Sequence, residues 1–168
     1  LEWLTDLVKH GGGAVVDFGC YGANLATWLL HGQEPETVLA VLHQHKPDIY
    51  PNVDDDATII VQYPDATVQI MASWSWPMNR KDMYVYGMKG YVYQKNSREM
   101  QTYLNESLSP FFKAPELPEV FENPFRFLRA VVRDEIQMEP YDPSSLENNI
   151  MVVRILEAAR KSAARQRV

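Results

Sequence analysis

The order of hydrophobic and polar residues changes its period along the chain, and each period predicts a kind of secondary structure. From residue 67 to 76, apolar and polar side chains alternate one by one, as in a strand with one buried face. From residue 146 onward, apolar residues recur every three or four positions, as along one side of a helix. The sequence therefore predicts helices over residues 1–9, 17–30, 125–137 and from 146, and strands over 37–45, 57–63, 67–76, 82–86 and 91–94.

Glycine and proline residues separate these elements. Gly11, Gly12 and Gly13 end the first helix, and Gly32 ends the second. Prolines crowd residues 109–124, so that stretch is expected to be a surface loop without regular structure. The order of helices, then strands joined by short turns, then helices indicates an α+β fold, with a mostly antiparallel open sheet and helices packed on one face.

Composition narrows the classes of function. The chain has 168 residues, which fits one domain over residues 1–168. A net charge of −6 argues against a nucleic-acid or membrane-surface partner. Cys20 is the only cysteine, so no internal disulfide can form and a reducing compartment fits. No apolar run reaches the roughly 20 residues of a membrane span, and a chain that begins at Leu1 rather than Met is expected to be a fragment.

The sequence lacks the marks of a nucleotide-binding fold. Strands and helices do not alternate, and no G-x-G-x-x-G motif follows a predicted strand. The triple glycine at 11–13 follows a helix end, and no acidic residue caps a second strand about 20 positions later. We therefore expect this chain alone to bind no dinucleotide.

The candidate chemistry lies just after the triple glycine. Asp17, Tyr21 and Asn24 are spaced i, i+4 and i+7, so a helix places them on one face. An acid, a phenol and an amide aligned beside a glycine hinge suggest a reaction site. Each part also has a simpler interpretation: Asp17 as a helix N-cap, Tyr21 as a packing residue, and the glycines as a loop with positive φ.

Two further patterns allow both a functional and a structural interpretation. His43 and His45 alternate on a predicted strand, where they would bind a metal together with the acidic triplet 54–56. No third ligand is fixed by the spacing, so we expect a solvated turn and no metal site. Trp74 and Trp76 share a strand face that suits either a sugar or the core.

Two surfaces complete the candidates. Arg80 and Lys81 follow Pro77, where they would reach a polyol or a cofactor phosphate, or would simply lie in a solvated turn. The second face of the strand over 67–76 carries Met71 with serine, threonine and glutamine residues. That face is either an interface between copies of the chain or a plain solvent-facing surface.

The most distinctive motif of the chain is Asp17-x-Gly19-x-Tyr21-x-x-Asn24. Together with other segments, it resembles nearly all of the C-terminal domain of the Gfo/Idh/MocA oxidoreductases. The resemblance implies that an N-terminal Rossmann domain, which binds NAD or NADP in the intact enzyme, lies outside this chain. The other matching segments are Trp3-Leu4, Gly11-Gly12-Gly13, Val53-Asp54-Asp55, Tyr63-Pro64, Tyr86-Gly87-x-x-Gly90-Tyr91 and Ile155–Ser162.

The resemblance also implies roles for the candidate residues. Many family members have histidine at the position of Tyr21. A tyrosine there is similar to the glucose–fructose oxidoreductase and dihydrodiol dehydrogenase branch, in which it is the proposed acid or base. Asp17 would support this residue as a second catalytic group, and Asn24 stands where a second carboxylate is common. Asn24 and Arg80, with Tyr21, are the expected substrate contacts.

A reaction and its partners follow from the same resemblance. The intact enzyme would transfer a hydride between NAD or NADP and a sugar, polyol or related carbinol, whereas this chain alone would be inactive and hold no cofactor. Gly12 and Gly13 would seat the helix beneath the cofactor. The expected partners are the Rossmann domain and a second copy paired through the open sheet face, and the expected location is the cytoplasm. Alternatives are a non-catalytic sugar-binding or dimerisation module and an NAD-dependent glycosidase of the same family.

Overall fold

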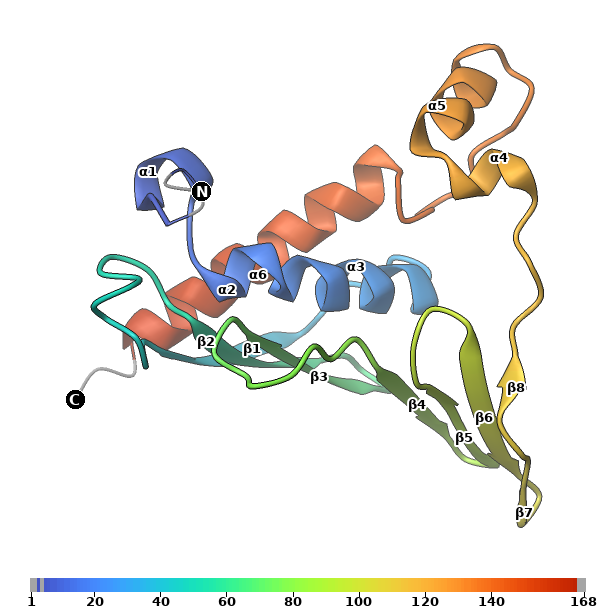
Figure 1. Ribbon diagram of the computed structural model, residues 1–168, viewed down its shortest axis with the longest axis horizontal. Helices are drawn as coiled ribbons and strands as arrows, with labels where there is room; N and C mark the ends of the chain where they lie inside the picture. The colour runs from blue at the N-terminus through green and yellow to red at the C-terminus, as the bar shows by residue number, and fades with distance from the viewer. Residues whose placement is uncertain (1–2, 4, 166–168) are drawn as a thin grey trace. The chain divides into compact units, whose positions relative to one another are not determined.

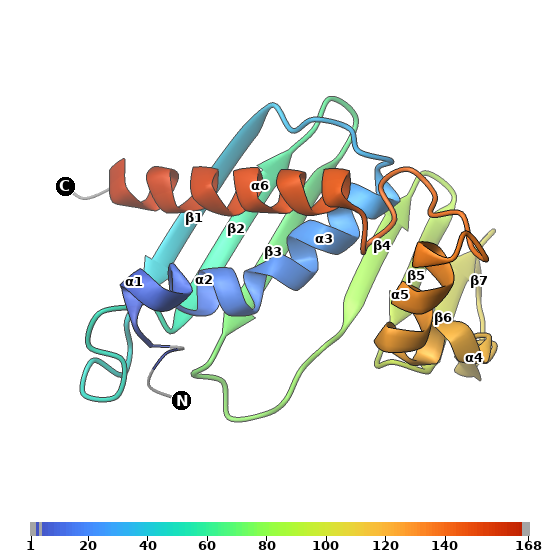
Figure 2. The same cartoon turned by 90° about the horizontal axis from the view of Figure 1, so that it is seen from above.

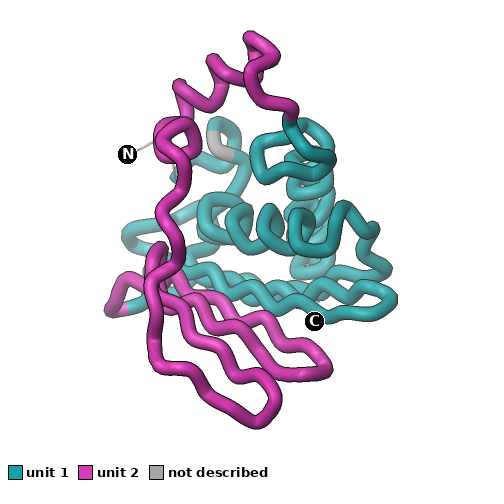
Figure 3. Tube along the Cα trace, turned by 90° about the vertical axis from the view of Figure 1, so that its right-hand side faces the viewer, with its two compact units in different colours: residues 1–76, 138–168 teal, residues 77–137 magenta. Residues whose placement is uncertain are grey.

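A computed structural model describes residue 3 and residues 5–165 of the chain. Two compact units are present, one of residues 1–76 with 138–168 and one of residues 77–137 (Figure 3). Helices and antiparallel strands occur together, which confirms the expected α+β class. Within the described ranges, no helix is both long and apolar enough to cross a membrane.

The sheet of the first unit has three antiparallel strands. In spatial order they are β1 (Thr37–His43), β2 (Asp56–Gln62) and β3 (Thr67–Ser73). Ile59 in the central strand lies opposite Ala40 on one side and Ile70 on the other. β-branched residues in the strands and the tight turn at 64–66 favour this meander.

Helices cover one face of this sheet (Figures 1 and 2). They are α2 (Ala14–Asp17), α3 (Gly19–Leu29) and the long α6 (Leu146–Arg165), and α1 (Leu7–His10) precedes them. Burial of one face fixes the strand register, because a slip of one residue would turn every apolar side chain to the other face. The core between sheet and helices includes Val15, Ala23, Ala57, Ile59, Val61, Ile70, Ala72, Met151, Ile155 and Leu156.

The second unit has an antiparallel sheet of its own. Its strands are β4 (Met83–Gly87), β5 (Gly90–Gln94), β6 (Glu99–Leu104), β7 (Ser107–Leu108) and β8 (Phe112–Lys113), and both β7 and β8 pair with β6. Two helices follow, α4 (Glu119–Glu122) and α5 (Pro124–Val132). Cross-strand pairing places five tyrosines on one face of this sheet, where their rings pack against one another: Tyr84, Tyr86, Tyr91, Tyr93 and Tyr103.

Some predicted boundaries differ from the structure. The helix predicted over 17–30 begins at Ala14 and is interrupted at Phe18, between α2 and α3. The strand predicted over 67–76 ends at Ser73, and the helix predicted over 125–137 ends at Val132. For the helix predicted over 1–9, the described residues are helical only from Leu7, and residues 1, 2 and 4 lie outside the described part.

The prediction of an irregular loop over residues 109–124 is wrong in two places. The segment contains β8, in which Phe112 lies opposite Met100 and Lys113 lies opposite Glu99 of β6. It also contains the single turn of α4, which follows Pro118. Both elements are too short to show a hydrophobic period in the sequence. β8 depends on its pairing with β6, and α4 depends on Pro118 at its start.

Candidate active site

The N-terminus of α2, the helix that ends at Asp17, is capped by Asp54, a residue far away in the sequence. Gly13 is its N-cap, and it lacks a side chain to accept the first N–H groups of the helix. Asp54 supplies those acceptors instead. Its carboxylate accepts the N–H of Gly13 at 3.2 Å and that of Val15 at 2.7 Å, and its carbonyl accepts the N–H of Ala14 at 3.0 Å. Burial raises the pKa of Asp54, although the N–H groups of Val15 and Gly13 act to lower it.

Close packing leaves little room for a side chain at two of the three glycines, and least at Gly13, where the obstacle is backbone. A Cβ on Gly13 would lie 1.8 Å from the carbonyl oxygen of Asp54, and one on Gly12 would lie 2.7 Å from a methyl group of Val16. Atoms of the chain itself therefore occupy the space beside both glycines. Contact of Gly12 and Gly13 with a cofactor remains a prediction.

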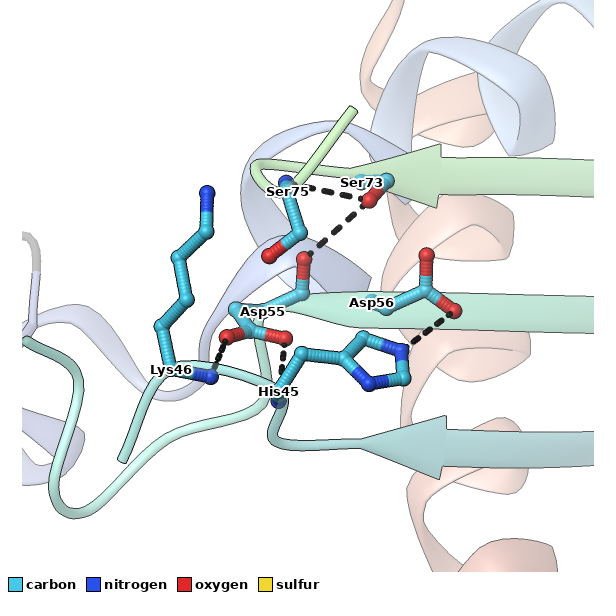
Figure 4. A network of polar contacts seen from close by, with 6 residues as sticks. All are labelled: His45, Lys46, Asp55, Asp56, Ser73 and Ser75. Atoms are coloured by element: carbon cyan, nitrogen blue, oxygen red, sulfur yellow. Dashed lines mark hydrogen bonds and ion pairs between the residues drawn. The ribbon is translucent and has the colours of Figure 1, made fainter. Parts of the chain in front are cut away.

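Asp55 joins the loop at residues 45–46 to Trp74 through hydrogen bonds (Figure 4 shows its contacts with His45 and Lys46). Its side chain is fully buried, and its carboxylate accepts the N–H of His45 at 2.9 Å and that of Lys46 at 2.7 Å. Its carbonyl accepts the N–H of Trp74 at 2.8 Å. The predicted solvated turn over 54–56 is therefore wrong at its centre, because the Asp55 side chain is buried and its carboxylate accepts N–H groups of the loop that follows β1. Burial acts to raise the pKa of Asp55, but hydrogen bonds to the carboxylate, chiefly from the His45 and Lys46 N–H groups and also from Ser75, together with the charge of His45 hold that pKa below its usual value.

Asp55→Asn is expected to lower the free energy of unfolding at neutral pH by about 2 kcal/mol, because two buried N–H groups lose a charged acceptor. The folded-state pKa of Asp55 lies below the unfolded value of about 3.9. Its contribution is therefore complete above that value and is lost as the pH falls through the folded pKa. Urea unfolding at neutral pH and at about pH 3 measures both effects. Asp65→Asn, in an exposed turn, is the control, and equal losses in the two variants would contradict this account.

The histidines near this loop do not gather a metal-ligand set. The rings of His43 and His45 stack with centroids 5.3 Å apart, and His45 Nε2 lies 3.9 Å from Asp56 Oδ2. In the described part of the chain, no three His, Cys, Asp or Glu side chains lie close enough to hold a metal ion.

Asp17 is the last residue of α2, and its carboxylate faces Trp74. The indole Nε1–H of Trp74 donates to Asp17 Oδ2 at 2.9 Å. Trp74 follows β3, and its ring packs against Tyr50 with centroids 5.0 Å apart. The interpretation of Asp17 as the N-cap is wrong, because Gly13 occupies that position.

Tyr21 lies one helical turn later, in the first turn of α3. Its backbone N–H donates to the carbonyl of Phe18 at 3.3 Å, and its ring lies 6.5 Å from that of Phe18. The side chain of Tyr21 is 51% exposed, which is more than a core packing residue allows. Tyr21 is thus half-exposed, four residues after Asp17 along the chain.

Asn24 and Arg80 are engaged elsewhere. The side-chain amide of Asn24 donates to the carbonyl of Pro143 at 2.9 Å, which ties α3 to the loop before α6. The fully buried Asn148 donates to the Asn24 carbonyl at 3.5 Å. Arg80 belongs to the second unit, where its Nη2 donates to Asp82 at 3.1 Å and the Asp82 carboxylate raises the pKa of the guanidinium. The structure therefore places Asp17, Tyr21 and Asn24 on the consecutive helices α2 and α3, whereas Arg80 belongs to the other compact unit.

Residues 1–93 match the family model of the GFO/IDH/MocA C-terminal domain. The chain belongs to the Gfo/Idh/MocA family. Its relatives include trans-1,2-dihydrobenzene-1,2-diol dehydrogenase of Xenopus tropicalis, 29% identical over 82 residues, which are 49% of this chain and 24% of that protein. The same enzyme of Bos taurus is 38% identical over 60 residues, 36% of this chain and 16% of that protein. The resemblance predicted from the Asp17–Asn24 motif is confirmed.

Solved oxidoreductases share the fold. Aldose-aldose oxidoreductase from Caulobacter crescentus, complexed with glycerol, superposes with a TM-score of 0.77 at 23% identity, over 98% of this chain and 49% of that chain. GenD2 from gentamicin A biosynthesis, in complex with NAD, gives 0.72 at 22% identity, over 99% and 50%. The chain thus spans about half the length of these two proteins.

The sequence did not identify two contacts that shape this Gfo/Idh/MocA domain. The sequence places Asp54 in an acidic turn and Trp74 on a strand face, but their partners Gly13 and Asp17 lie 41 and 57 residues away along the chain. The buried Asn148 carries no pattern that would have singled it out. The sequence gives the type of each side chain, but it does not show which distant residue that side chain will hydrogen-bond to in the fold.

Proposed function

We propose that this chain is the substrate-binding and oligomerisation domain of an NAD(P)-dependent oxidoreductase that acts on a sugar, polyol or related carbinol by hydride transfer. Membership of the Gfo/Idh/MocA family and relatives named as dehydrogenases support the reaction class. The observation that carries the proposal is the half-exposed phenol of Tyr21, one turn after a carboxylate held in place by Trp74.

The proposed chemistry divides between two domains. When bound, a nicotinamide cofactor would supply the hydride acceptor or donor for the carbinol carbon, and we assign its binding to an N-terminal Rossmann domain. The described residues of this chain contain no strand–glycine-loop–helix unit for a pyrophosphate, and the chain's own atoms fill the space beside Gly12 and Gly13.

Tyr21 moves the proton in this proposal. As the carbinol is oxidised, its C–H bond breaks with the electron pair leaving as hydride, and its O–H proton passes to the deprotonated Tyr21 oxygen. Reduction of the carbonyl runs in reverse, with the phenol donating. A phenol gives up its proton near neutral pH only beside positive charge, which a neighbouring ammonium group and the oxidised nicotinamide would supply. Asp17 orients this group or a substrate hydroxyl, and Asn24 and Arg80 are the proposed substrate contacts.

The test uses the full-length protein that contains this chain. Purified protein is mixed with NAD⁺ or NADP⁺ and a panel of aldoses, polyols, dihydrodiols and glycosides; reduced cofactor is followed by its absorbance, and released sugar is followed by chromatography. Turnover of a carbinol supports the proposal. Tight binding of sugar without cofactor reduction would instead support a binding module, and cleavage of a glycoside without net reduction would support the glycosidase alternative.

The open face of the first sheet is the proposed contact between copies. Leu39, Val41, Ile60 and Met71 on this face are between 37% and 51% exposed, so the helix-free side of the sheet is apolar at its centre. Charged residues are scarce there, and a two-fold pairing would bury the same patch from both copies.

Met71→Lys is expected to weaken self-association at least tenfold, because the pairing would bury an ammonium group opposite its own copy. Light scattering over a dilution series measures the dissociation constant. Val153→Lys is the matched control, since Val153 is 64% exposed on α6 and lies outside the sheet. Unchanged association of the Met71 variant would remove this face from the interface.

A further inference from the structure

Asp17 has one strong polar contact, and that contact comes from a distant part of the chain. The indole N–H of Trp74 lies 2.9 Å from Asp17 Oδ2 in a half-buried setting. Within the described residues, Asp17 takes part in no ion pair. An indole can only donate a hydrogen bond, so the Asp17 carboxylate accepts, and this contact occupies one of its two oxygens.

Trp74 is itself fixed on two sides. Its backbone N–H donates to the carbonyl of the fully buried Asp55 at 2.8 Å. Its ring packs against that of Tyr50, with centroids 5.0 Å apart and planes inclined by 52°. Asp55 is in turn anchored by the N–H groups of His45 and Lys46, so the indole projects from a rigid loop cluster.

The backbone that carries the Asp17 carboxylate is also held in place. Asp17 ends α2, a single turn whose first N–H groups bond to Asp54. Asp54 and Asp55 are adjacent in the sequence, so one short segment positions both the helix that carries Asp17 and the indole that bonds to it. Neither Trp74 nor Asp17 can move far without breaking contacts made by buried groups.

We infer that Trp74 is a positioning residue for Asp17: it holds one carboxylate oxygen and leaves the other for the reacting groups near Tyr21. This inference rests on the proposed function, because it assigns Trp74 an effect on hydride transfer. It also distinguishes Trp74 from a sugar-stacking residue, since a stacking role would depend on the ring face and not on the N–H.

Trp74→Phe keeps an aromatic ring against Tyr50 and removes the N–H donor together with the fused pyrrole ring, a loss of size that the control variant shares. In the full-length enzyme it is expected to lower kcat about tenfold, the low end of what a hydrogen bond to a charged group contributes. KM should stay within about twofold, because Asp17 is positioned for the transition state more than for binding. Trp28→Phe, an exposed tryptophan on α3, is the matched control and should leave kcat unchanged.

A double-mutant cycle with Asp17→Ala tests whether Trp74 acts through Asp17. Once the carboxylate is gone, Trp74→Phe should cost less than about twofold in kcat. A tenfold loss in both backgrounds would overturn the inference, as would a Trp74 variant that behaves like the Trp28 control. A rise in KM with unchanged kcat would also overturn it and would point to a stacking role.

A second readout is independent of turnover. Trp74→Phe identifies the indole N–H resonance of Trp74 by its disappearance from the NMR spectrum of the full-length protein. That resonance should be protected from exchange with water, and Asp17→Ala should abolish the protection. If the wild type turns over no substrate, the proposed function fails, whatever the NMR result. If Asp17→Ala leaves the protection of the Trp74 N–H unchanged, the inferred contact between Trp74 and Asp17 is overturned, whatever the kinetics show.

Discussion

Gly13→Ala should destabilise the chain by about 3 kcal/mol or more, enough to unfold a domain of ordinary stability. A Cβ at this position would lie 1.8 Å from the carbonyl oxygen of Asp54, a separation that real Cβ contacts essentially never show. Relief requires Gly13 and Asp54 to move apart. That movement breaks the bonds from Gly13, Ala14 and Val15 to Asp54, each worth about 1 kcal/mol net.

Gly11→Ala is the control for this experiment. Gly11 has a φ of +88° and open space around its Cβ position, so alanine there costs only the backbone strain, about 1 kcal/mol. Urea unfolding gives the free energy of unfolding of the two variants and the wild type. The Gly13 variant reports the cost of steric overlap, and the Gly11 variant reports the cost of backbone strain. A Gly13 variant as stable as the Gly11 variant would show that the Asp54 contact does not hold the helix.

The sheet and the last helix could be predicted because their residues follow a period set by burial. Ile59, Val61, Ile70 and Ala72 alternate with polar or exposed residues, and all four are buried against the helices. Burial of one face is a local property of strand geometry, so it leaves a local pattern. α6 shows the same principle with a helical period, since its buried residues recur on one side.

Boundaries and site contacts depend instead on residues far apart in the sequence. α2 starts at Ala14 because Asp54 supplies its acceptors, and no residue near position 14 signals this. The motif Asp17, Tyr21 and Asn24 was visible because helical spacing is local. The hydrogen bond from the Asn24 side-chain amide to the carbonyl of Pro143 could not be predicted, because the two residues are 119 positions apart in the sequence.

Tyr21→Phe should lower turnover of the full-length enzyme by about 10²-fold or more, because it removes the group proposed to carry the carbinol proton. The ring stays, so its contact with Phe18 and the exposed surface of α3 should be preserved. The free energy of unfolding should therefore change little, and KM should change less than kcat. Steady-state kinetics and urea unfolding on the same preparation separate a chemical effect from a folding effect.

Tyr86→Phe is the matched control for this prediction. Tyr86 is 72% exposed on β4 of the second unit, and the same hydroxyl is removed without touching the helix that carries Asp17. Turnover of the Tyr86 variant should equal that of the wild type. If the Tyr21 variant also turns over at a near-normal rate, the proton must travel by another group, and the accessible phenol beside Asp17 would be a binding feature. A loss confined to the Tyr21 variant, with stability unchanged, would place the proton transfer on this helix.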